Sequence, residues 1–418
     1  MKKKIWIINH YAIWMLHSKG GRHYWLSENL RKEGYEPVIF CCNINHKNLK
    51  NGNQFIEPSS LWGEKVDEDI QTPFVYIRSN TYAGNGIARI KNMIGFYLNL
   101  LKVVKEYAAI NGKPDIIYAS SPHPLDILAG IKIAKHFGVK CIGEVRDLWP
   151  EGFIAYGLAG SYNPVVLYLR QLEKEVYKKV DALIFTFEGG YDYIKEQGWD
   201  KEIPRSKVHY INNGIDLEQF DYNKQNFRIQ DEDLENEDIF KVVYTGSIRH
   251  VNNLGKLLDV AKLIKNSKIK FLIWGDGDEL FKLKERVKNE SIKNVIFKGK
   301  VEKKYIPYIT SKANLNLAHN NNSPLFRFGI SFNKIFDYLA SGRPILCDFY
   351  AKYNPVLSCR AGVAVDSGNI IDIAKMIDIM SSNHVVELAE YGKNARNGVK
   401  EYDFKNLMQK LIDIFNDI

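Results

Sequence analysis

The sequence has no long apolar segment. No stretch reaches the roughly 18 uninterrupted apolar residues that a membrane span requires. The first residues, MKKKIWIINHYAIW, place an apolar run behind lysines, but the run is short and His10 interrupts it. We interpret this start as a β-strand, because a secretory signal needs a longer apolar centre. A protein integral to the membrane is therefore not expected.

Cysteine is scarce, and its spacing does not match the common cysteine-based sites. There are five cysteines, most of them inside apolar runs: Cys41, Cys42, Cys141, Cys347 and Cys359. An odd number in such runs is typical of reduced core thiols in a cytosolic protein. No Cys-x-x-Cys pair or Cys/His cluster indicates zinc. The acidic triplet at 231–233 lies in a charged insert where solvation explains it, so we expect no metal ion.

Length and charge bound the remaining classes. A chain of 418 residues is too long for one ordinary core, so two domains are expected. Lysine and arginine number 58 against 49 aspartates and glutamates, a net charge of +9. This excess favours an anionic partner such as nucleic acid, a phosphorylated substrate or an anionic membrane. A lysine-rich surface with no partner explains the same charge.

Apolar strand-like runs alternate with helical patterns along almost the whole chain. The runs lie at 3–10, 35–43, 115–121, 140–147, 182–187 and 208–214, then at 241–247, 269–277, 295–300, 313–319, 344–349 and 362–366. Continuous apolar runs are typical of parallel strands buried on both faces. We therefore predict an α/β fold with two successive parallel-sheet units. Ligands should bind at the carboxyl ends of the strands, in a cleft between the units.

The segment GISFNKIFDYLASGRPIL, at 329–346, places charged residues in a short amphipathic helix. Ser331 is a candidate N-cap, and the N–H groups that follow it would face an anion. Lys334 and Asp337 are three residues apart and share a helix face. A lysine beside a helix N-terminus suits phosphate, and an acid one turn deeper suits a pair of sugar hydroxyls. The alternative is an ordinary ion pair between Lys334 and Asp337.

Three further glycine loops follow predicted strands. YTGSIRH ends a strand at Gly246 and places Arg249 in the next turn, where close backbone and a guanidinium suit phosphate. SKGGRHYW opens a helix with Gly20 and Gly21, a candidate loop for an anion or a sugar. WGDGDE, at 274–279, contains Gly-x-Gly, which is more often a tight turn. A solvated turn explains each loop alone, but all lie where strand ends face a ligand.

The ordered set of these motifs resembles the GT-B glycosyltransferases of family 4, which retain the configuration of the donor sugar. In the second half the resemblance rests on HYINNGIDLEQF, YTGSIR, IWGDGDE, FKGKV and the segment at 329–346. In the first half it rests on GGRHYWLSENLRKEGYEPVIF. EVRDLWPEG resembles a subset that builds bacterial surface polysaccharides, O-antigen or capsule. The resemblance implies two Rossmann-like domains facing each other across a cleft.

The resemblance also implies domain limits. An acceptor-side domain would span 1–210 and a nucleotide-sugar domain 211–400. The last segment, 401–418, would be a helix that crosses back to the first domain.

The family's signature, Glu followed after seven residues by Glu, departs from its pattern here. The second Glu falls on Asp337, to which the resemblance assigns the ribose hydroxyls. The first falls on Gly329, which has no side chain to contact the donor sugar. Backbone amides of Gly329, Ile330 and Ser331 are expected to do that work, and Arg327 or His319 are the alternatives.

The family's Arg and Lys pair on the diphosphate is carried to Arg249 and Lys334, with Lys256 offset. Together with helix N–H groups, these cations would neutralise the departing diphosphate without a metal or other cofactor. Gly246, Gly20 and Gly21 would let backbone approach the donor. UDP is favoured because it is the family's common nucleotide, and the transferred sugar would be a hexose or an N-acetylhexosamine.

A histidine that many family members have at the end of the fourth strand is replaced here by Arg146. An arginine cannot act as a general base. Asp147 or Glu144 would then contact the acceptor or sugar, or the donor phosphate would take the acceptor proton. His123 in SSPHPLD is a further candidate, and an ordinary loop histidine is an equal interpretation.

Two amphipathic segments suggest how an acceptor is reached. Residues 87–107 and 165–180 combine lysine and arginine with broad apolar faces. Such helices can lie on an anionic membrane, although packing against a core is the commoner use. The resemblance to polysaccharide enzymes implies an acceptor glycan linked to a polyprenyl diphosphate. It also implies a cytoplasmic protein peripheral to the inner face of the cell membrane.

Three other functions fit parts of the sequence. A sugar-nucleotide epimerase of the same fold would need no second substrate and no membrane-facing helix. A catalytically weak homologue that only binds a nucleotide sugar is suggested by Gly329 and the missing histidine. A nucleic-acid-binding protein would concentrate basic and aromatic residues in one groove, whereas here the charge is dispersed.

Overall fold

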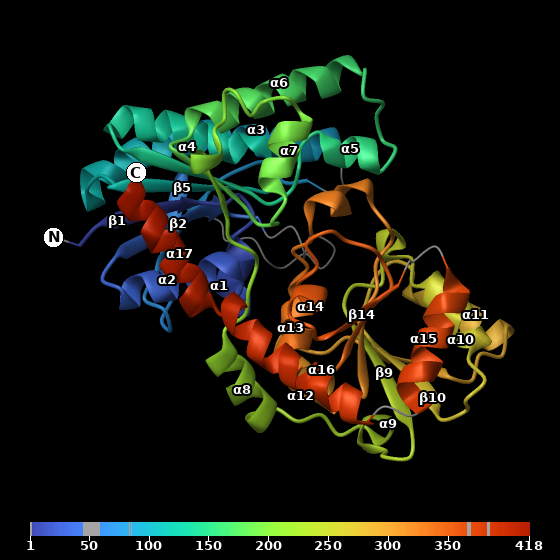
Figure 1. Ribbon diagram of the computed structural model, residues 1–418. Coiled ribbons are helices and arrows are strands. Elements are labelled where there is room, and N and C mark those ends of the chain that lie inside the picture. The colour runs from blue at the N-terminus through green and yellow to red at the C-terminus, as the bar shows by residue number, and fades with distance from the viewer. Residues whose placement is uncertain (1, 45–58, 83, 85, 366–368, 383–384) are drawn as a thin grey trace. The chain divides into compact units, whose positions relative to one another are not determined.

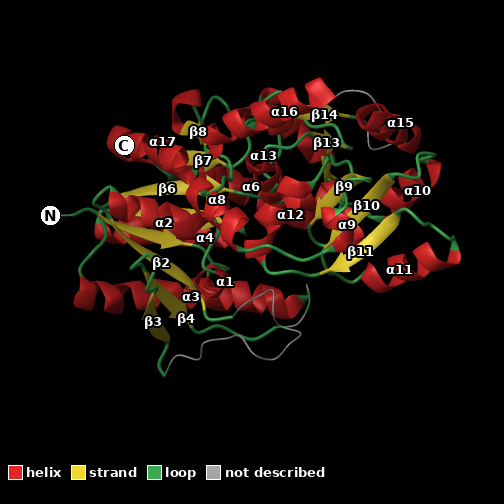
Figure 2. Ribbon diagram, turned by 90° about the horizontal axis from the view of Figure 1, so that it is seen from below, coloured by secondary structure: helices red, strands yellow, loops and turns green. Residues whose placement is uncertain are grey.

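The computed structural model describes residues 2–44, 59–82, 84, 86–365, 369–382 and 385–418. Its contacts divide the chain into two units (Figure 1). The N-terminal unit contains Met1–Asn212 and the last residues, Leu407–Ile418, and the C-terminal unit contains Asn213–Asn406. Each unit is a parallel β-sheet with helices packed on it (Figure 2), which confirms the predicted fold class.

Eight strands form the sheet of the N-terminal unit. Their order across the sheet is β3 (Trp62–Val66), β4 (Pro73–Ile77), β2 (Glu36–Cys42), β1 (Lys4–Ile8), β5 (Ile116–Ser121), β6 (Lys140–Val145), β7 (Ala182–Phe185) and β8 (Val208–Tyr210). All neighbours are parallel except β3, which runs antiparallel to β4. The sequence analysis predicts neither β3 nor β4: β3 is a half-polar, exposed edge strand, and the short, buried β4 directly follows a polar stretch. The first strand at the chain start is confirmed as the buried β1.

The helices of the N-terminal unit lie between these strands. They are α1 (Ile13–Ser18), α2 (Arg22–Lys32), α3 (Ile87–Asn111), α4 (Pro124–Phe137), α5 (Glu151–Ala155), α6 (Pro164–Lys179) and α7 (Gly190–Glu196), with the end of α17 (Phe404–Asp417) joining them. The short helix α1 lies between β1 and the Gly20–Gly21 loop. Gly21 separates α1 from α2 with φ at 114°, and a Cβ there would lie 2.8 Å from Trp14, so only glycine fits this turn.

Six parallel strands form the sheet of the C-terminal unit. Their order is β11 (Val295–Gly299), β10 (Ile269–Trp274), β9 (Phe240–Thr245), β12 (Leu315–Ala318), β13 (Ile345–Cys347) and β14 (Gly362–Ala364). All six match predicted runs, although residue 366 of the last run lies outside the described residues. The order changes direction at β9, so connections leave it toward both sides of the sheet. That switch point is where ligands bind in open α/β sheets.

The helices of the C-terminal unit connect these strands. They are α8 (Leu217–Asn226), α9 (Glu232–Glu235), α10 (Gly255–Leu263), α11 (Leu280–Asn289), α12 (Ile306–Lys312), α13 (Asn333–Ser341), α14 (Pro355–Ser358), α15 (Ile370–Ser382) and α16 (Val385–Gly398). Single 3-10 turns occupy Arg205–Lys207 in the first unit and His250–Asn252, Lys303–Tyr305, Pro324–Phe328 and Val399–Tyr402 in the second.

Ion pairs rather than solvation alone hold the acidic triplet at 231–233. The ammonium of Lys298 lies 2.7 Å from the carboxylate of Asp231 and 2.6 Å from that of Asp233. Helix α9, which begins within this triplet, buries Leu234 in a small core cluster. The charged insert is therefore tied to β11 by its acids.

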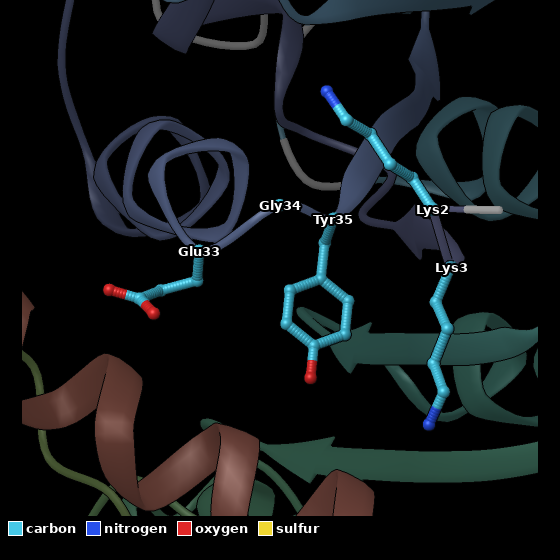
Figure 3. Close-up of a pocket in the computed structure, with 5 residues that line it drawn as sticks. All are labelled: Lys2, Lys3, Glu33, Gly34 and Tyr35. Carbon is cyan, nitrogen blue, oxygen red and sulfur yellow. The ribbon is translucent and has the colours of Figure 1, made fainter.

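Within the described part of the chain, no helix is long and apolar enough to cross a bilayer. A surface hollow is lined by Lys2, Lys3, Glu33, Gly34 and Tyr35 (Figure 3). These residues precede β1 and β2, so the hollow lies at the amino edge of the sheet, away from the carboxyl ends where chemistry is expected.

Candidate active site

In the C-terminal unit, Lys334 lies at the carboxyl end of β9. Its ammonium donates to the hydroxyl of Tyr244 at 3.2 Å and to the carbonyl of His319 at 3.3 Å. It also lies 4.4 Å from the centre of the Tyr244 ring. A Cβ added to Gly246 would lie 3.4 Å from the same ammonium. Two residues predicted from separate motifs, Gly246 and Lys334, are thus neighbours.

Lys334 and Asp337 do not form the ordinary ion pair that was the alternative interpretation. Within the described chain no salt bridge joins them, and the partners of Lys334 are neutral oxygens. Burial lowers the pKa of Lys334, while Tyr338 and Asp348 oppose that shift. Burial raises the pKa of Asp337, with Lys303 opposing it. Both groups are held partly desolvated without a neutralising partner, which is a frequent property of ligand-binding groups.

Tyr338 fixes helix α13 to the strand end, a role that sequence reasoning missed. Its hydroxyl accepts a hydrogen bond at 2.9 Å from the backbone N–H of Thr245, the last residue of β9. Tyr338 lies one turn after Lys334, so the two side chains share the helix face toward β9. In the sequence, only the spacing of four residues between Lys334 and Tyr338 indicates this role. Tyr338 also fits the apolar core pattern of the helix, so the spacing does not single it out.

The loop before α13 adopts a conformation that excludes a glutamate side chain at 329. Gly329 has φ at 102°, in the region that favours glycine. Ser331 is not the N-cap of α13, a correction to the sequence interpretation; Phe332 occupies that position and its side chain makes no capping bond. The Ser331 hydroxyl instead accepts from the N–H of Asn213 at 3.2 Å. The buried Ile330 anchors the loop between them.

Asn213 explains why the NNGID segment accompanies this loop. Its amide donates to the carbonyl of Ser331 at 2.8 Å, in addition to the backbone contact with the serine hydroxyl. The following Asp216 caps helix α8 by accepting from the N–H of Gln219 at 2.7 Å. In contrast to α8, α13 receives no bond from its N-cap side chain to its first-turn N–H groups.

Arg249 lies beyond β9 in an exposed position, and the described residues give it no ion-pair partner. Lys256 lies in the first turn of α10, half-buried. The glycines at 275 and 277 pack against backbone: a Cβ on Gly275 would meet the carbonyl of Gly246 at 1.9 Å. The close approach of the backbone therefore requires glycine at both positions of this Gly-x-Gly, in line with the tight-turn interpretation.

His319 and Arg327, the two side chains that could replace the missing glutamate, already form hydrogen bonds within the protein. The imidazole of His319 is buried, with Nδ1 bonded to Asp348 and Nε2 lying 3.1 Å from the carbonyl of Asn253. The guanidinium of Arg327 bonds the carbonyl of Pro324 and lies over the Phe328 ring. His319 therefore positions the strand end, and its carbonyl, not its ring, contacts Lys334.

In the N-terminal unit, Glu144 is the centre of a buried network. Its carboxylate accepts from Arg22 Nε at 2.6 Å, Ser120 Oγ at 2.7 Å and His23 Nε2 at 3.2 Å, and from the Tyr118 hydroxyl. Burial alone would raise the pKa of Glu144, but the charge of Arg22 holds it well below its usual range. Glu144 is fully enclosed, so its carboxylate is not open to an acceptor arriving from solvent.

Arg22, which sequence reasoning missed, connects this network to the end of the N-terminal unit. Its guanidinium also donates to the carbonyls of Asn212 and Ile211, at 2.5 and 3.0 Å. It occupies the first position of α2, directly after Gly20 and Gly21. The glycine loop therefore places the buried guanidinium of Arg22 beside Glu144. The loop's conformation does not require a bound anion as an explanation.

The two remaining acceptor-side candidates differ in exposure. Asp147 follows β6 in an exposed position beside the half-buried Arg146. His123 is the N-cap residue of α4 and is wholly buried, which lowers its pKa well below the usual range. Its Nε2 lies 3.6 Å from a carboxylate oxygen of Asp126. Of the predicted acceptor-side residues, Asp147 is thus the one open to solvent.

Comparisons with known proteins agree with this geometry. A family model for Glycosyltransferase Family 4 matches residues 24–219, and one for Glycosyl transferases group 1 matches residues 225–398. No curated protein matches the sequence.

Many solved structures share the fold. Sucrose-phosphate synthase from Thermosynechococcus elongatus has a TM-score of 0.72 at 16% identity, over 100% of this chain and 99% of that one. HepE from Anabaena in complex with UDP has a TM-score of 0.68 at 13% identity, over 100% of both chains. A UDP-forming α,α-trehalose-phosphate synthase from Burkholderia vietnamiensis has a TM-score of 0.67 at 11% identity, over 99% and 96%.

At identities of 11–16%, the structural likeness shows the fold alone. The family assignment rests on the two family models, which match the amino-acid sequence. The models cover the two α/β units in succession, with their junction between 219 and 225. With its two parallel-sheet units and a lysine at the switch point of the second, the chain belongs to the GT-B glycosyltransferases of the family 4 type.

Proposed function

We propose that this glycosyltransferase moves a hexose or N-acetylhexosamine from a UDP-sugar to a lipid-linked glycan in bacterial surface polysaccharide synthesis, with retention of configuration. The observation that carries the proposal is the placement of Lys334. Its ammonium lies beside Gly246 at the switch point of the second sheet, with neutral oxygens as its partners. A partly desolvated cation at such an edge suits a diphosphate.

The choice of UDP is supported by the fold neighbours. HepE from Anabaena is described in complexes with UDP and with UDP-glucose. In this chain Asp337 lies one turn after Lys334 and forms no ion pair with it, so its carboxylate is available for two ribose hydroxyls. The N-terminus of α13 and Arg249 would supply the remaining positive potential.

Departure of UDP is the step that these groups assist. As the bond from the anomeric carbon to the diphosphate breaks, negative charge grows on the phosphate oxygen. Lys334, Arg249 and the first N–H groups of α13 would stabilise that charge. The acceptor hydroxyl would attack from the same face and pass its proton to the departing phosphate. The enclosed Glu144 cannot take the proton, and Asp147 would orient the acceptor.

The lipid-linked acceptor is supported by helix α3. Its exposed face carries Ile87, Ile90, Ile94 and Leu98, at spacings of three and four residues, and these side chains are 44–73% exposed. Lys91, Lys102 and Lys105 are exposed on the same helix. An apolar stripe edged by lysines matches an anionic bilayer surface, where aliphatic groups enter the interface and ammonium groups meet lipid phosphates.

A catalytically weak nucleotide-sugar-binding protein is the second candidate. The observation that favours it is the backbone at Gly329, which leaves no side chain where the family has its first glutamate. An epimerase of the same fold would have no use for the exposed apolar face of α3. Incubation with UDP-sugar alone separates these cases, because an epimerase converts the donor without an acceptor.

A thermal-shift titration tests the donor site. UDP, GDP, CDP and ADP are added to the wild-type chain, to Asp337→Ala and to Glu285→Ala, an exposed carboxylate on α11 that serves as control. We expect UDP to raise the melting temperature, since a native-state ligand at a hundredfold excess over Kd adds about 2.7 kcal/mol. Loss of charged hydrogen bonds to ribose should weaken binding by about 1.5–3 kcal/mol in Asp337→Ala.

The increment caused by UDP should be the same with and without EDTA and the same in the Glu285→Ala control. No increment with any nucleotide would contradict a nucleotide-sugar transferase. An equal increment in Asp337→Ala would remove the ribose assignment while leaving the fold in place.

A further inference from the structure

His10, His123 and Asp126 converge inside the N-terminal unit. One ligand-type atom from each lies within 4.8 Å of the others, and all three side chains are buried. His10 follows β1, and His123 and Asp126 begin helix α4 after β5. The cluster therefore lies at the carboxyl edge of two adjacent strands. The donor site, which lies in the C-terminal unit, does not use it.

Two of these side chains have polar atoms that the described protein leaves unsatisfied. Neither ring nitrogen of His123 makes a hydrogen bond, and neither does Oδ1 of Asp126. Nε2 of His123 and Oδ1 of Asp126 are 3.6 Å apart. Buried polar atoms without partners are rare in folded proteins, and an ion or water is a usual explanation. In a tetrahedral zinc site, ligand atoms about 2.0–2.1 Å from the metal are roughly 3.3 Å apart.

The surrounding bonds orient His10 as a metal ligand. The amide nitrogen of Asn92 donates to the carbonyl of Asn80 at 2.6 Å, so its oxygen is the atom that faces His10. His10 Nε2 must then donate to that oxygen, at 2.8 Å, and the ring's lone pair is on Nδ1. Histidines that bind metals commonly donate their other N–H in this way.

Asp126 is oriented by a similar bond. Its Oδ2 accepts from the backbone N–H of His10 at 2.9 Å, which leaves Oδ1 directed to the cluster. The aromatic rings of Phe96 and Tyr11 pack against His10 and exclude water from one side. The guanidinium of Arg89, bonded to the Tyr11 hydroxyl, is a nearby charge that opposes a cation. The carboxylate of Asp126 offsets it.

We propose that His10, His123 and Asp126 bind one divalent transition-metal ion, for which Zn²⁺ is the best match. Two imidazole nitrogens and one carboxylate oxygen form a ligand set that zinc accepts, with a fourth position left for water. The ion ties the loop after β1 to the start of α4 and so stiffens the acceptor-side edge of the sheet. This role is separate from UDP binding, which uses residues of the C-terminal unit.

Metal content and cobalt spectroscopy test the site. The full chain without a histidine tag is unfolded, refolded with ZnCl₂ or with EDTA, and desalted, because enclosed ligands load most readily during folding. Elemental analysis should find about one zinc per chain in the wild type and a loss of at least tenfold in His123→Ala and Asp126→Asn. His136→Ala, an exposed histidine on the same helix α4, should retain the metal.

Refolding with CoCl₂ should give the intense visible bands of four-coordinate cobalt, and zinc should raise the melting temperature of the wild type more than that of Asp126→Asn. If His123→Ala does not fold, the wild-type cobalt spectrum decides the case. Absence of retained zinc in the wild type would overturn the proposal, as would equal retention in His123→Ala or only the weak bands of hydrated cobalt. The UDP titration tests the donor site in the C-terminal unit. The metal proposal and the donor proposal can therefore be refuted independently of each other.

Discussion

At the scale of single residues, Lys334 combines features that seldom occur in a structural lysine. A lysine held for stability usually pairs with a carboxylate, whereas the ammonium here contacts a phenol, a carbonyl and an aromatic ring. Burial lowers its pKa, so a nearby dianion that restores the charge would bind favourably. The exposed Arg249 differs, because solvent screens its charge in the turn after β9.

Removal of these cations should affect the transition state more than the ground state. Lys334→Ala is expected to lower kcat by about 10²–10³-fold, the effect of deleting one group that stabilises developing charge. Arg249→Ala should have a smaller effect in the same direction, since its charge is screened by solvent. Kd for UDP should rise by less than about tenfold in both. Steady-state kinetics and a UDP titration measure the two quantities.

Lys375→Ala on helix α15 provides the control, because that lysine is exposed and lies on another element. Equal losses in kcat and in UDP affinity would indicate simple ground-state binding by Lys334. An unchanged kcat would exclude it from the donor site.

At the scale of secondary-structure elements, α3 has an outer face that packing within its own unit does not explain. One side packs Phe96, Leu100, Val103 and Val104 into the core. The opposite side carries the exposed isoleucines and lysines described above. A helix that only covers a sheet needs one apolar stripe, so the second stripe calls for another contact.

Charge placed in that second stripe should abolish membrane binding. The double variant Ile90→Glu and Ile94→Glu is expected to lose cosedimentation with vesicles that contain anionic lipid. Burial of each isoleucine in the interface is worth about 1.5–3 kcal/mol, so affinity should fall by roughly a hundredfold or more. The melting temperature should change little, because both side chains are exposed in the protein.

The matched control is Ile379→Glu, an exposed isoleucine of the C-terminal unit. Wild-type binding should also weaken when the ionic strength is raised or the anionic lipid is omitted. Retained vesicle binding by the double variant would refute the assignment of α3 as the membrane face.

At the scale of the whole molecule, the end of the chain belongs to the unit that contains its beginning. Residues Leu407–Ile418 group with the N-terminal unit by their contacts. Leu407, Met408 and Leu411 are buried, and the ring of Phe415 lies 5.8 Å from that of Tyr35. Figure 1 shows this helix, α17, in red beside α2. The N-terminal unit therefore includes a segment that is almost 200 residues away in sequence from the rest of the unit.

Deletion of 407–418 should destabilise the N-terminal unit. Removal of several buried apolar side chains, each worth about 1.5–3 kcal/mol, approaches the whole stability of an ordinary domain. Tryptophan fluorescence measures the effect, because six of the seven tryptophans precede residue 213 and only Trp274 follows it. We expect the fluorescence transition to move to lower temperature while UDP still binds. A transition at the wild-type temperature would argue against a supporting role for α17.

The sequence by itself determined the fold class and the order of the site segments. Both follow from local patterns: apolar runs of strand length, helical spacing between them, and glycines at strand ends. Gly246 and Lys334 were predictable as neighbours because both come after parallel strands. Gly246 follows β9 and the helix of Lys334 comes after β12, and the carboxyl ends of these strands lie at the same edge of the sheet. The amphipathic pattern of α3 was likewise visible in its spacing, although the side that is exposed was not.

Only the tertiary structure decided how charged groups are used. From its segment EVRD, Glu144 was a candidate for contact with the acceptor or sugar, but in the structure it is buried and bonded to Arg22, which lies far away in the sequence. Ser331 has the residue type of an N-cap, yet Asn213 occupies its hydroxyl. No local motif joins His10 to His123 and Asp126, because β1 and β5 become neighbours only when the sheet assembles. Spacing along a chain reports contacts within an element, whereas charge pairing and metal ligation depend on distances that arise between elements.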